Sequence, residues 1–283
     1  MASNSSIIDV ATFDINSLEV SDFKETSFNK AQNVAMILYN KQKFIIQSPW
    51  MLYNVHGIKP FGEYIKNDDD RNFIRIPLDV DNFPKLKIFK NKIAEIDKLF
   101  DSNDFKTKFF TSKNVKNHKY GKLIRMCEKS DNYIAKPAKL DKNGVPYKSV
   151  DMFTVPYITG KLNYDYSNDW RKISTVLIHN IDGVKKVMAF KTVSDLVKLI
   201  PYQSKIRYVI ELFKLGEMKT KDDYKNVKYN ANFKILMIEV KPFVKSNTAI
   251  NITCEDLIDD SDDEDIIENK SDDEDASEDS DDE

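Results

Sequence analysis

The chain has 283 residues, of which 41% are hydrophobic and 31% are charged, so its composition favours a folded globular protein over a wholly disordered one. Its longest apolar run, residues 34–39, is far shorter than the ~20 residues of a membrane-spanning helix, which argues against a membrane protein. The start of the chain lacks the basic and apolar regions of a secretory signal, and two cysteines, Cys127 and Cys254, are too few for a disulfide framework, so we expect an intracellular protein.

The first half of the chain predicts strands followed by one helix. Residues 1–30 are polar with scattered apolar positions and predict a loose N-terminal extension. Short β-branched and aromatic runs then predict strands over 34–39, 43–47, 50–55 and 71–78, with a turn at 40–42 between the first two. The period changes at residue 88, where apolar residues recur at helical spacing. This pattern predicts an amphipathic helix over 85–100, beginning after Pro84.

The second half predicts further strands joined by hairpins. The candidate strands cover residues 123–127, 133–140, 148–155, 173–181, 184–191, 205–215 and 233–240. The dipeptides Asn143-Gly144 and Asp182-Gly183 are typical of tight hairpin turns. Residues 192–200 predict a short capped helix that stops at Pro201. Many short strands with hairpin connections favour a mainly β fold, an antiparallel barrel or sandwich with inserted helices.

The net charge of −3 is the sum of two parts of the chain with opposite charge. Residues 1–254 hold 42 Lys and Arg against 28 Asp and Glu, a net charge of +14, whereas residues 255–283 hold 18 acidic residues and one lysine, a net charge of −17. A basic body indicates binding to a polyanion such as nucleic acid, although lysine-rich surfaces are also common in proteins from AT-rich genomes. We expect residues 246–283 to form a disordered acidic tail.

The tail allows two interpretations. It can occupy the same cationic groove as nucleic acid, be displaced by the authentic ligand and then recruit basic partner proteins, or it can serve only for solubility. Three Ser-Asp-Asp-Glu units fit the specificity of an acidophilic kinase, which makes Ser261, Ser271 and Ser280 candidate phosphorylation sites. Each phosphate would add about −1.5 to −2 charges.

The sequence contains no recognisable catalytic or metal-binding constellation, so we expect neither an enzyme nor a cofactor or metal. His56, His118 and His179 have no second histidine or cysteine at ligand spacing, and each fits a structural role. The stretch 57–62 has the outer glycines of a phosphate loop, but Glu63 and Tyr64 follow where such a loop needs Lys and Ser or Thr. The acidic run 68–70 fits a solvated loop better than a cation site.

Aromatic and basic residues interleave along the predicted strands, which is the composition of a surface for single-stranded nucleic acid. Lys205 and Arg207 alternate with Ile206 and Tyr208, which places both cations on one strand face. With 17 Phe, 13 Tyr and 2 Trp in the chain, most aromatics must belong to the core, and a solvated basic face is an equal alternative. The candidate contacts are Trp50, Tyr53, Lys59, Arg75, Arg125, Lys136, Lys139, Tyr147, Lys148, Lys205, Arg207 and Tyr208.

Three stretches carry a resemblance to a known family. These are Phe44-Ile-Ile-Gln-Ser-Pro-Trp-Met51 with Gly57-Ile58 after it, Lys205-Ile-Arg-Tyr-Val-Ile-Glu-Leu212, and Phe233-Lys-Ile-Leu-Met-Ile-Glu-Val240. With the basic body and acidic tail, they resemble the phage-type single-stranded DNA-binding proteins and their counterparts in nucleocytoplasmic large DNA viruses. The resemblance implies an OB-like barrel over residues 31–245 and a tail that contacts replication proteins. One departure is that the tail ends in Asp282-Glu283 and contains no aromatic residue, whereas the phage tails end in one.

The leading hypothesis is a non-enzymatic, non-sequence-specific single-stranded DNA-binding protein of viral replication, recombination or repair, located at the replication site in the host cytoplasm. Replication proteins would bind through the acidic tail, no membrane is involved, and a homodimer is one of the oligomeric states left open. The alternatives are a virion or scaffold interaction protein and an acidic-tailed chaperone of basic proteins, neither with a DNA-binding role in replication. An OB-like fold alone does not decide between them.

Overall fold

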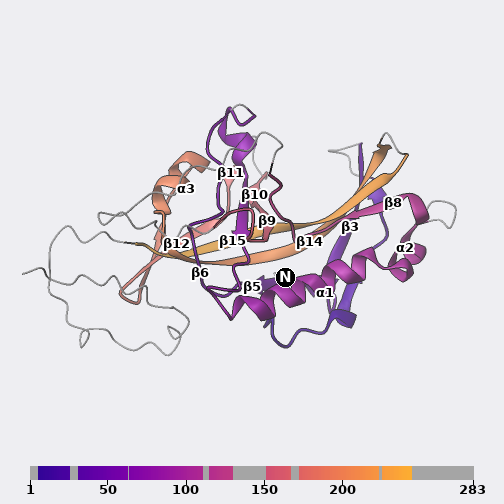
Figure 1. Cartoon of the computed structure of the whole chain (residues 1–283), viewed down its shortest axis with the longest axis horizontal. Helices are drawn as coiled ribbons and strands as arrows, with labels where there is room; N and C mark the ends of the chain where they lie inside the picture. Colours follow the sequence, from indigo (N-terminus) through magenta and orange to yellow (C-terminus); the bar gives the residue numbers. More distant parts are fainter. Residues whose placement is uncertain are drawn as a thin grey trace, which may run out of the picture.

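The computed structural model describes residues 6–25, 31–62, 64–110, 115–129, 151–166, 172–222 and 225–243. Strands predominate in these ranges, which confirms the mainly β prediction (Figure 1). The strands are β1 (Leu18–Val20), β2 (Lys24–Glu25), β3 (Gln32–Tyr39), β4 (Gln42–Lys43), β5 (Ile45–Gln47), β6 (Met51–Leu52), β7 (Phe73–Pro77), β8 (His118–Gly121), β9 (Tyr157–Leu162), β10 (Tyr164–Asp165), β11 (Lys172–Ile173), β12 (Val176–Ile181), β13 (Val184–Met188), β14 (Lys205–Lys221) and β15 (Val227–Lys241). The helices are α1 (Leu86–Asp101), α2 (Asn103–Phe109) and α3 (Val193–Leu199), with 3-10 turns η1 (Ile15–Ser17), η2 (Asp68–Arg71) and η3 (Val115–Asn117).

One large sheet is built around the two longest strands, β14 and β15, which pair as an antiparallel hairpin. The strand order is β1-β3-β14-β15-β12-β13, while β5 and β6 also pair with β14, β8 and β9 also pair with β15, and β7 pairs with β9. The sheet is open, and β8, β9 and β12 run parallel to β15. It therefore departs from a closed antiparallel barrel. Hairpin signals specify only consecutive strands, whereas these three strands meet β15 across long stretches of chain.

Two predicted hairpin turns are confirmed. Asn40 and Lys41 have φ values of 48° and 64° between β3 and β4, and Asp182 and Gly183 have φ values of 51° and 79° between β12 and β13. Positive φ at both central residues is the hairpin geometry that matches the twist of paired strands. The turn predicted at residues 143–144 lies outside the described residues.

The two predicted helices are confirmed, and a third is present. Helix α1 buries one stripe of its surface, including Phe89, Ile93 and Ile96. Helix α3 begins at a capping box, in which Thr192 Oγ1 accepts the N–H of Asp195 and the Asp195 carboxylate accepts the N–H of Thr192. The sequence does not predict α2, because this helix has only seven residues and follows α1 directly. Among the described helices, none is both long and apolar enough to span a membrane.

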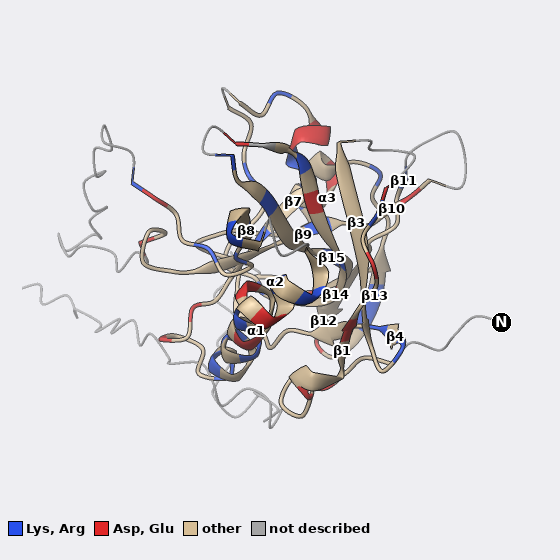
Figure 2. Ribbon diagram, turned by 90° about the vertical axis from the view of Figure 1, so that its right-hand side faces the viewer, with Lys and Arg blue, Asp and Glu red and all other residues tan. Residues whose placement is uncertain are grey.

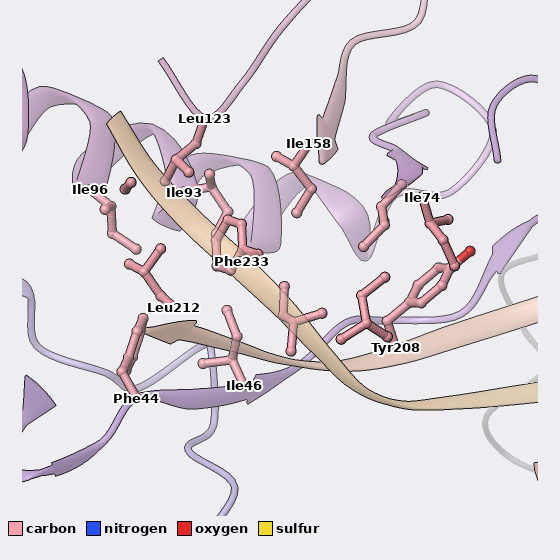
Figure 3. Close-up of a cluster of buried hydrophobic side chains, with 14 of the residues drawn as sticks. Phe44, Ile46, Ile74, Ile93, Ile96, Leu123, Ile158, Tyr208, Leu212 and Phe233 are labelled. Atoms are coloured by element: carbon pink, nitrogen blue, oxygen red, sulfur yellow. The ribbon is translucent and has the colours of Figure 1, made fainter. Parts of the chain in front are cut away.

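The hydrophobic core lies between α1 and the inner face of the sheet. Ile93 and Ile96 of α1 point toward Leu212 of β14 and Phe233 of β15, as Figure 3 shows. Because side chains alternate along a strand, the residues between these buried ones point to the opposite, outer face. On this outer face of the β14–β15 hairpin the basic side chains are half-buried, whereas Val209, Glu211 and Glu239 are nearly buried.

Several local predictions differ from the structure. Residues 123–127 form only an isolated bridge between Arg125 and Tyr157, because the Asp97 carboxylate accepts the backbone N–H groups of Leu123 and Ile124 that a strand would use. Residues 151–155 form turns instead of the end of a strand, and only Met51–Leu52 of the stretch 50–55 is a strand. Strands β8 and β9 are not predicted, and residues 133–140 lie outside the described ranges.

The N-terminal segment is less loose than the sequence predicts. Val10 and Phe13 are buried, and β1 pairs with β3. The Phe13 ring lies edge-on to Phe44, with 5.2 Å between the ring centroids. Residues 6–25 therefore cover part of the core, because their scattered apolar residues meet it at irregular intervals that no helix or strand period reveals.

Candidate nucleic-acid interface

The outer face of the β14–β15 hairpin carries a band of basic side chains. On β14, Ile206 and Tyr208 are fully buried, whereas Lys205 and Arg207 alternate with them and are only half-buried, as the sequence predicts. We call the outward side chains of this hairpin and of the neighbouring strands β9, β12 and β13 the cationic face. The lysine positions on β13 are blue in Figure 2. The basic members of the cationic face are Lys161, Lys185, Lys205, Arg207, Lys214, Lys234 and Lys241.

Trp50 lies between β5 and β6, at one end of the cationic face. The guanidinium carbon of Arg207 is 4.6 Å from a Trp50 ring centroid, and the Lys241 Nζ is 5.3 Å from it. Both distances fall in the range of cation–π contacts. Lys205 is directly opposite Lys241 in the β14–β15 register. We call Trp50, Lys205, Arg207 and Lys241 the Trp50 cluster, in which an indole ring and three cations share one surface.

Glu239 is a nearly buried carboxylate beside the Trp50 cluster. Its Oε2 accepts hydrogen bonds from Nε and Nη2 of Arg207, both at 2.8 Å. Its Oε1 accepts a hydrogen bond from Asn180 Nδ2 at 3.1 Å and lies 3.5 Å from Lys185 Nζ. Burial opposes its charge, but Arg207, Asn180 and Lys185 outweigh that effect and lower the pKa of Glu239. Glu239 therefore stays ionised and positions Arg207, while it competes with any incoming phosphate for the same donors.

The substitution Glu239→Gln is expected to tighten binding of single-stranded oligo-dT at low salt and to steepen its salt dependence. Glutamine keeps an oxygen acceptor for Arg207 but removes the negative charge that competes with phosphate. Fluorescence anisotropy over a salt series measures both effects. Glu25→Gln is the matched control, since Glu25 pairs with Lys219 at 2.6 Å outside the cationic face. Equal affinities of the two variants would show that Glu239 does not compete with the ligand.

The structure corrects the prediction that Tyr208 contacts the ligand. Tyr208 is fully buried, and its ring lies in the core (Figure 3). The same alternation that turns Arg207 outward turns Tyr208 inward. Burial raises the pKa of Tyr208 well above its usual value, with a further contribution from Tyr53, and its hydroxyl has no hydrogen-bond partner among the described residues. A base cannot stack on this ring.

The substitution Tyr208→Phe tests this correction. It removes a buried hydroxyl that makes no hydrogen bond within the described ranges, and such a group costs about 1–3 kcal/mol of stability. We therefore expect the free energy of unfolding to stay the same or to rise, as measured by urea denaturation. Oligo-dT affinity should be unchanged. A loss of affinity without a loss of stability would restore Tyr208 as a contact residue.

Tyr53 is half-buried and has a structural partner. Its hydroxyl accepts the backbone N–H of Ile58 at 3.2 Å, and burial raises its pKa despite this bond. Gly57 has a φ of 149° and passes so close that a Cβ there would lie 2.4 Å from the Tyr53 ring. The ring therefore packs under the 53–58 loop, which links β6 to the segment that carries Lys59.

Arg75 and Arg125 form a second group around Tyr157. The Arg75 guanidinium carbon lies 4.7 Å from the Tyr157 ring centroid, and its Nη1 is 3.2 Å from Cys127 Sγ. The Arg125 backbone pairs with the Tyr157 backbone through two hydrogen bonds of 2.8 and 2.9 Å. Arg125 is exposed, as is Lys59 on its loop, so both side chains are open to a ligand.

The remaining predicted residues lie outside the described ranges. These are the basic and aromatic candidates Lys136, Lys139, Tyr147 and Lys148 and the phosphorylation candidates Ser261, Ser271 and Ser280. The structure therefore brings together Trp50, Lys205 and Arg207, places Arg75 with Arg125, and removes Tyr208 from the surface.

The sequence prediction missed five lysines of the cationic face: Lys161, Lys185, Lys214, Lys234 and Lys241. Lys234 stands between buried Phe233 and Ile235 on a predicted strand, so the alternation argument used for Lys205 would have found it. The half-buried Phe213 lies at a β-bulge, where the register shifts between Leu212 and Lys214. No period reveals such a residue from sequence.

Within the described residues, no group of three or more His, Cys, Asp or Glu side chains is placed to hold a metal ion. The three histidines have contacts within the fold. His56 Nε2 is 2.9 Å from the Val155 carbonyl, His179 Nε2 is 2.7 Å from the Leu199 carbonyl, and His118 Nε2 is 2.9 Å from Glu217 Oε1. These contacts are those of structural histidines.

Comparison with known proteins finds similarities to viral proteins. No family model matches the chain. An uncharacterized protein of Acanthamoeba polyphaga mimivirus is 26% identical over 249 residues, which cover 81% of this chain but only 58% of the relative's length. The single-stranded DNA-binding protein gp2.5 of bacteriophage T7 has 11% identity and a TM-score of 0.33, covering 77% of this chain and 97% of its own. The single-stranded DNA-binding protein of bacteriophage Enc34 has 12% identity and a TM-score of 0.29, covering 84% of this chain and 98% of its own.

Proposed function

We propose that the protein binds single-stranded DNA without sequence preference. The observation that carries this proposal is the Trp50 cluster, where Arg207 and Lys241 lie 4.6 and 5.3 Å from the indole ring on the outer face of the sheet. A stacking ring beside cations meets the two needs of an unpaired strand, because its bases offer π-faces and its phosphates need positive partners.

The mechanism uses no chemical step. Lys205, Arg207 and Lys241 neutralise phosphates and release counterions, which makes the affinity fall steeply with salt. A base stacks on Trp50, and because every base has a π-face the contact is indifferent to sequence. A binding role of this kind needs no catalytic residue, so we propose a non-enzymatic protein.

The biological setting that we propose is viral DNA replication, recombination or repair at the replication site in the host cytoplasm. The viral part is supported by the mimivirus relative, which is 26% identical to this chain. The acidic tail, with a charge of −17 over residues 255–283, would compete with DNA for the cationic face and recruit replication proteins when displaced. Phosphorylation at Ser261, Ser271 and Ser280 would strengthen that competition, and a homodimer would align two such faces.

The tail proposal has a direct test. A chain ending at Cys254 should bind oligo-dT more tightly than the full-length chain at low salt, because it lacks the competing polyanion. The gain should shrink as salt screens the tail. A truncated chain of the same thermal stability but equal affinity would leave the tail only a solubilising role.

Competition between DNA forms tests the main proposal. Full-length protein is bound to labelled oligo-dT and challenged with unlabelled oligo-dT or with a blunt duplex of the same length. We expect the single strand to compete at least roughly ten-fold better, because a duplex hides the base faces that stack on Trp50. If the duplex competes as well as the single strand, the cationic face binds polyanions in general, which is what a virion or scaffold protein requires. A chaperone would bind basic proteins through its tail and neither DNA form.

A further inference from the structure

A second cluster of cations and aromatics lies farther along the cationic face. Four residues form one row across neighbouring strands: Phe73 of β7 is opposite Lys161 of β9, Lys161 is opposite Lys234 of β15, and Lys234 is opposite Glu211 of β14. Lys214 is opposite Asn232, two residues from Lys234 on the same face of β15. The register therefore collects three lysines from three strands.

A β-bulge adds an aromatic ring to these lysines. The register shift between Leu212 and Lys214 leaves Phe213 without an opposite residue, and a bulge of this kind re-aims its side chain. The Phe213 ring centroid lies 4.6 Å from Lys234 Nζ and 5.1 Å from Lys214 Nζ. Phe73, which is 45% exposed, has Lys161 Nζ 5.8 Å from its ring centroid.

The charges of this cluster favour an anion. Burial is the largest cause that lowers the pKa of Lys214, and the positive charges of Lys161 and Lys234 lower it further. The ammonium group of Lys214 is therefore repelled by those of the two other lysines. The carboxylate of Glu211 is 3.7 Å from Lys234 Nζ and is itself nearly buried. A phosphate placed among the lysines would relieve their mutual repulsion.

We propose that Lys161, Lys214, Lys234, Phe73 and Phe213 form a second subsite, which binds a phosphodiester and stacks an adjacent unpaired base of the same DNA strand that occupies the Trp50 cluster. The subsite rests on the proposed function and extends it to residues at a distance from Trp50. Arg207 and Lys214 are seven residues apart on β14, roughly 24 Å at a strand rise of about 3.4 Å per residue. Only a strand that follows the hairpin reaches both clusters.

Oligonucleotide length separates the two clusters in an experiment. Full-length protein is titrated with labelled oligo-dT of about 16 nucleotides and of about 4 nucleotides, the two limits of the site size of one OB-type module. For the long oligonucleotide we expect Phe213→Ala to weaken binding roughly ten-fold or more and Phe213→Tyr to preserve it. The double variant Lys161→Gln/Lys234→Gln should reduce the salt slope by about 0.7 for each phosphate that the protein no longer neutralises.

The controls decide between the outcomes. Lys87→Gln on the exposed side of α1 removes one charge away from the cationic face and should leave the slope nearly unchanged. A long oligonucleotide should gain more affinity over the short one in wild type than in Phe213→Ala, because only the long one spans both clusters. Thermal unfolding checks that each variant folds.

Two results overturn the subsite in distinguishable ways. If wild type binds and Trp50→Ala weakens binding, while the Phe213 and lysine variants bind both oligonucleotides like wild type, the proposed function stands and the second subsite is wrong. If wild type binds neither oligonucleotide at low salt, the proposed function fails and the subsite fails with it.

Discussion

Replacing Trp50 with alanine is expected to weaken oligo-dT binding by about 1–3 kcal/mol, the usual contribution of one stacked base. The loss has two sources. The indole face disappears, and Arg207 and Lys241, which lie over that face, lose the ring that orders them. The change should appear in affinity and only weakly in the salt slope, because no charge is removed. Fluorescence anisotropy with the full-length chain measures both.

Two further variants separate stacking from folding. Trp50→Phe keeps an aromatic face and should retain most of the affinity. Tyr64→Ala removes another aromatic, 86% exposed, that lies outside the cationic face, and should bind like wild type. If Trp50→Ala binds as tightly as Tyr64→Ala, the indole does not contact the ligand. Circular dichroism of each variant checks that the fold is intact.

Replacing Phe233 with alanine is expected to lower the free energy of unfolding by about 3–5 kcal/mol. Phe233 is 1% exposed and packs among Ile93, Leu123 and Leu212 at the centre of the core (Figure 3). Its loss leaves a cavity between α1 and the sheet, and the surrounding β14–β15 hairpin is too constrained by its ladder to collapse into it. Urea denaturation monitored by circular dichroism gives the change.

The neighbouring residue on the same strand provides the control. Asn232 points to the outer face, and Asn232→Ala should change stability by less than about 1 kcal/mol. The contrast between adjacent positions tests the assignment of inner and outer faces, on which the cationic face depends. Comparable losses in the two variants would mean that the outer face is also packed, and that it is not a ligand surface.

The parts of the fold that follow from a local period could be predicted. The stripe of Phe89, Ile93 and Ile96 indicates α1, and the alternation of Lys205 and Arg207 with buried neighbours indicates both a strand and its outward face. The Asp182-Gly183 turn can be predicted because a two-residue hairpin turn needs positive φ at both central residues, which Asp and Gly adopt readily. In each case the physical cause lies within one short stretch of sequence.

The missed features depend on contacts between distant segments. Asp97 binds the backbone of residues 123 and 124 and so prevents a strand that their composition favours. The parallel pairing of β9 with β15 brings Lys161 beside Lys234. The parallel pairing of β12 with β15 brings β13, which pairs with β12, and its Lys185 beside Glu239, and no local signal specifies such pairing. The bulge at Phe213 exists only in relation to β15. The composition therefore predicts a cationic surface, but the pairing register of the strands determines which lysines and arginines lie together on it.

The most direct test of a single-stranded DNA-binding face is the affinity of the full-length chain for labelled oligo-dT across a salt series. Binding at low salt, with an affinity that falls linearly on a log–log plot, is the predicted result, and a slope of about −0.7 per phosphate gives the number of phosphates that the protein neutralises. Absence of binding at low salt, despite a net charge of +14 on residues 1–254, would contradict the account. The basic surface would then belong to a protein partner or a capsid.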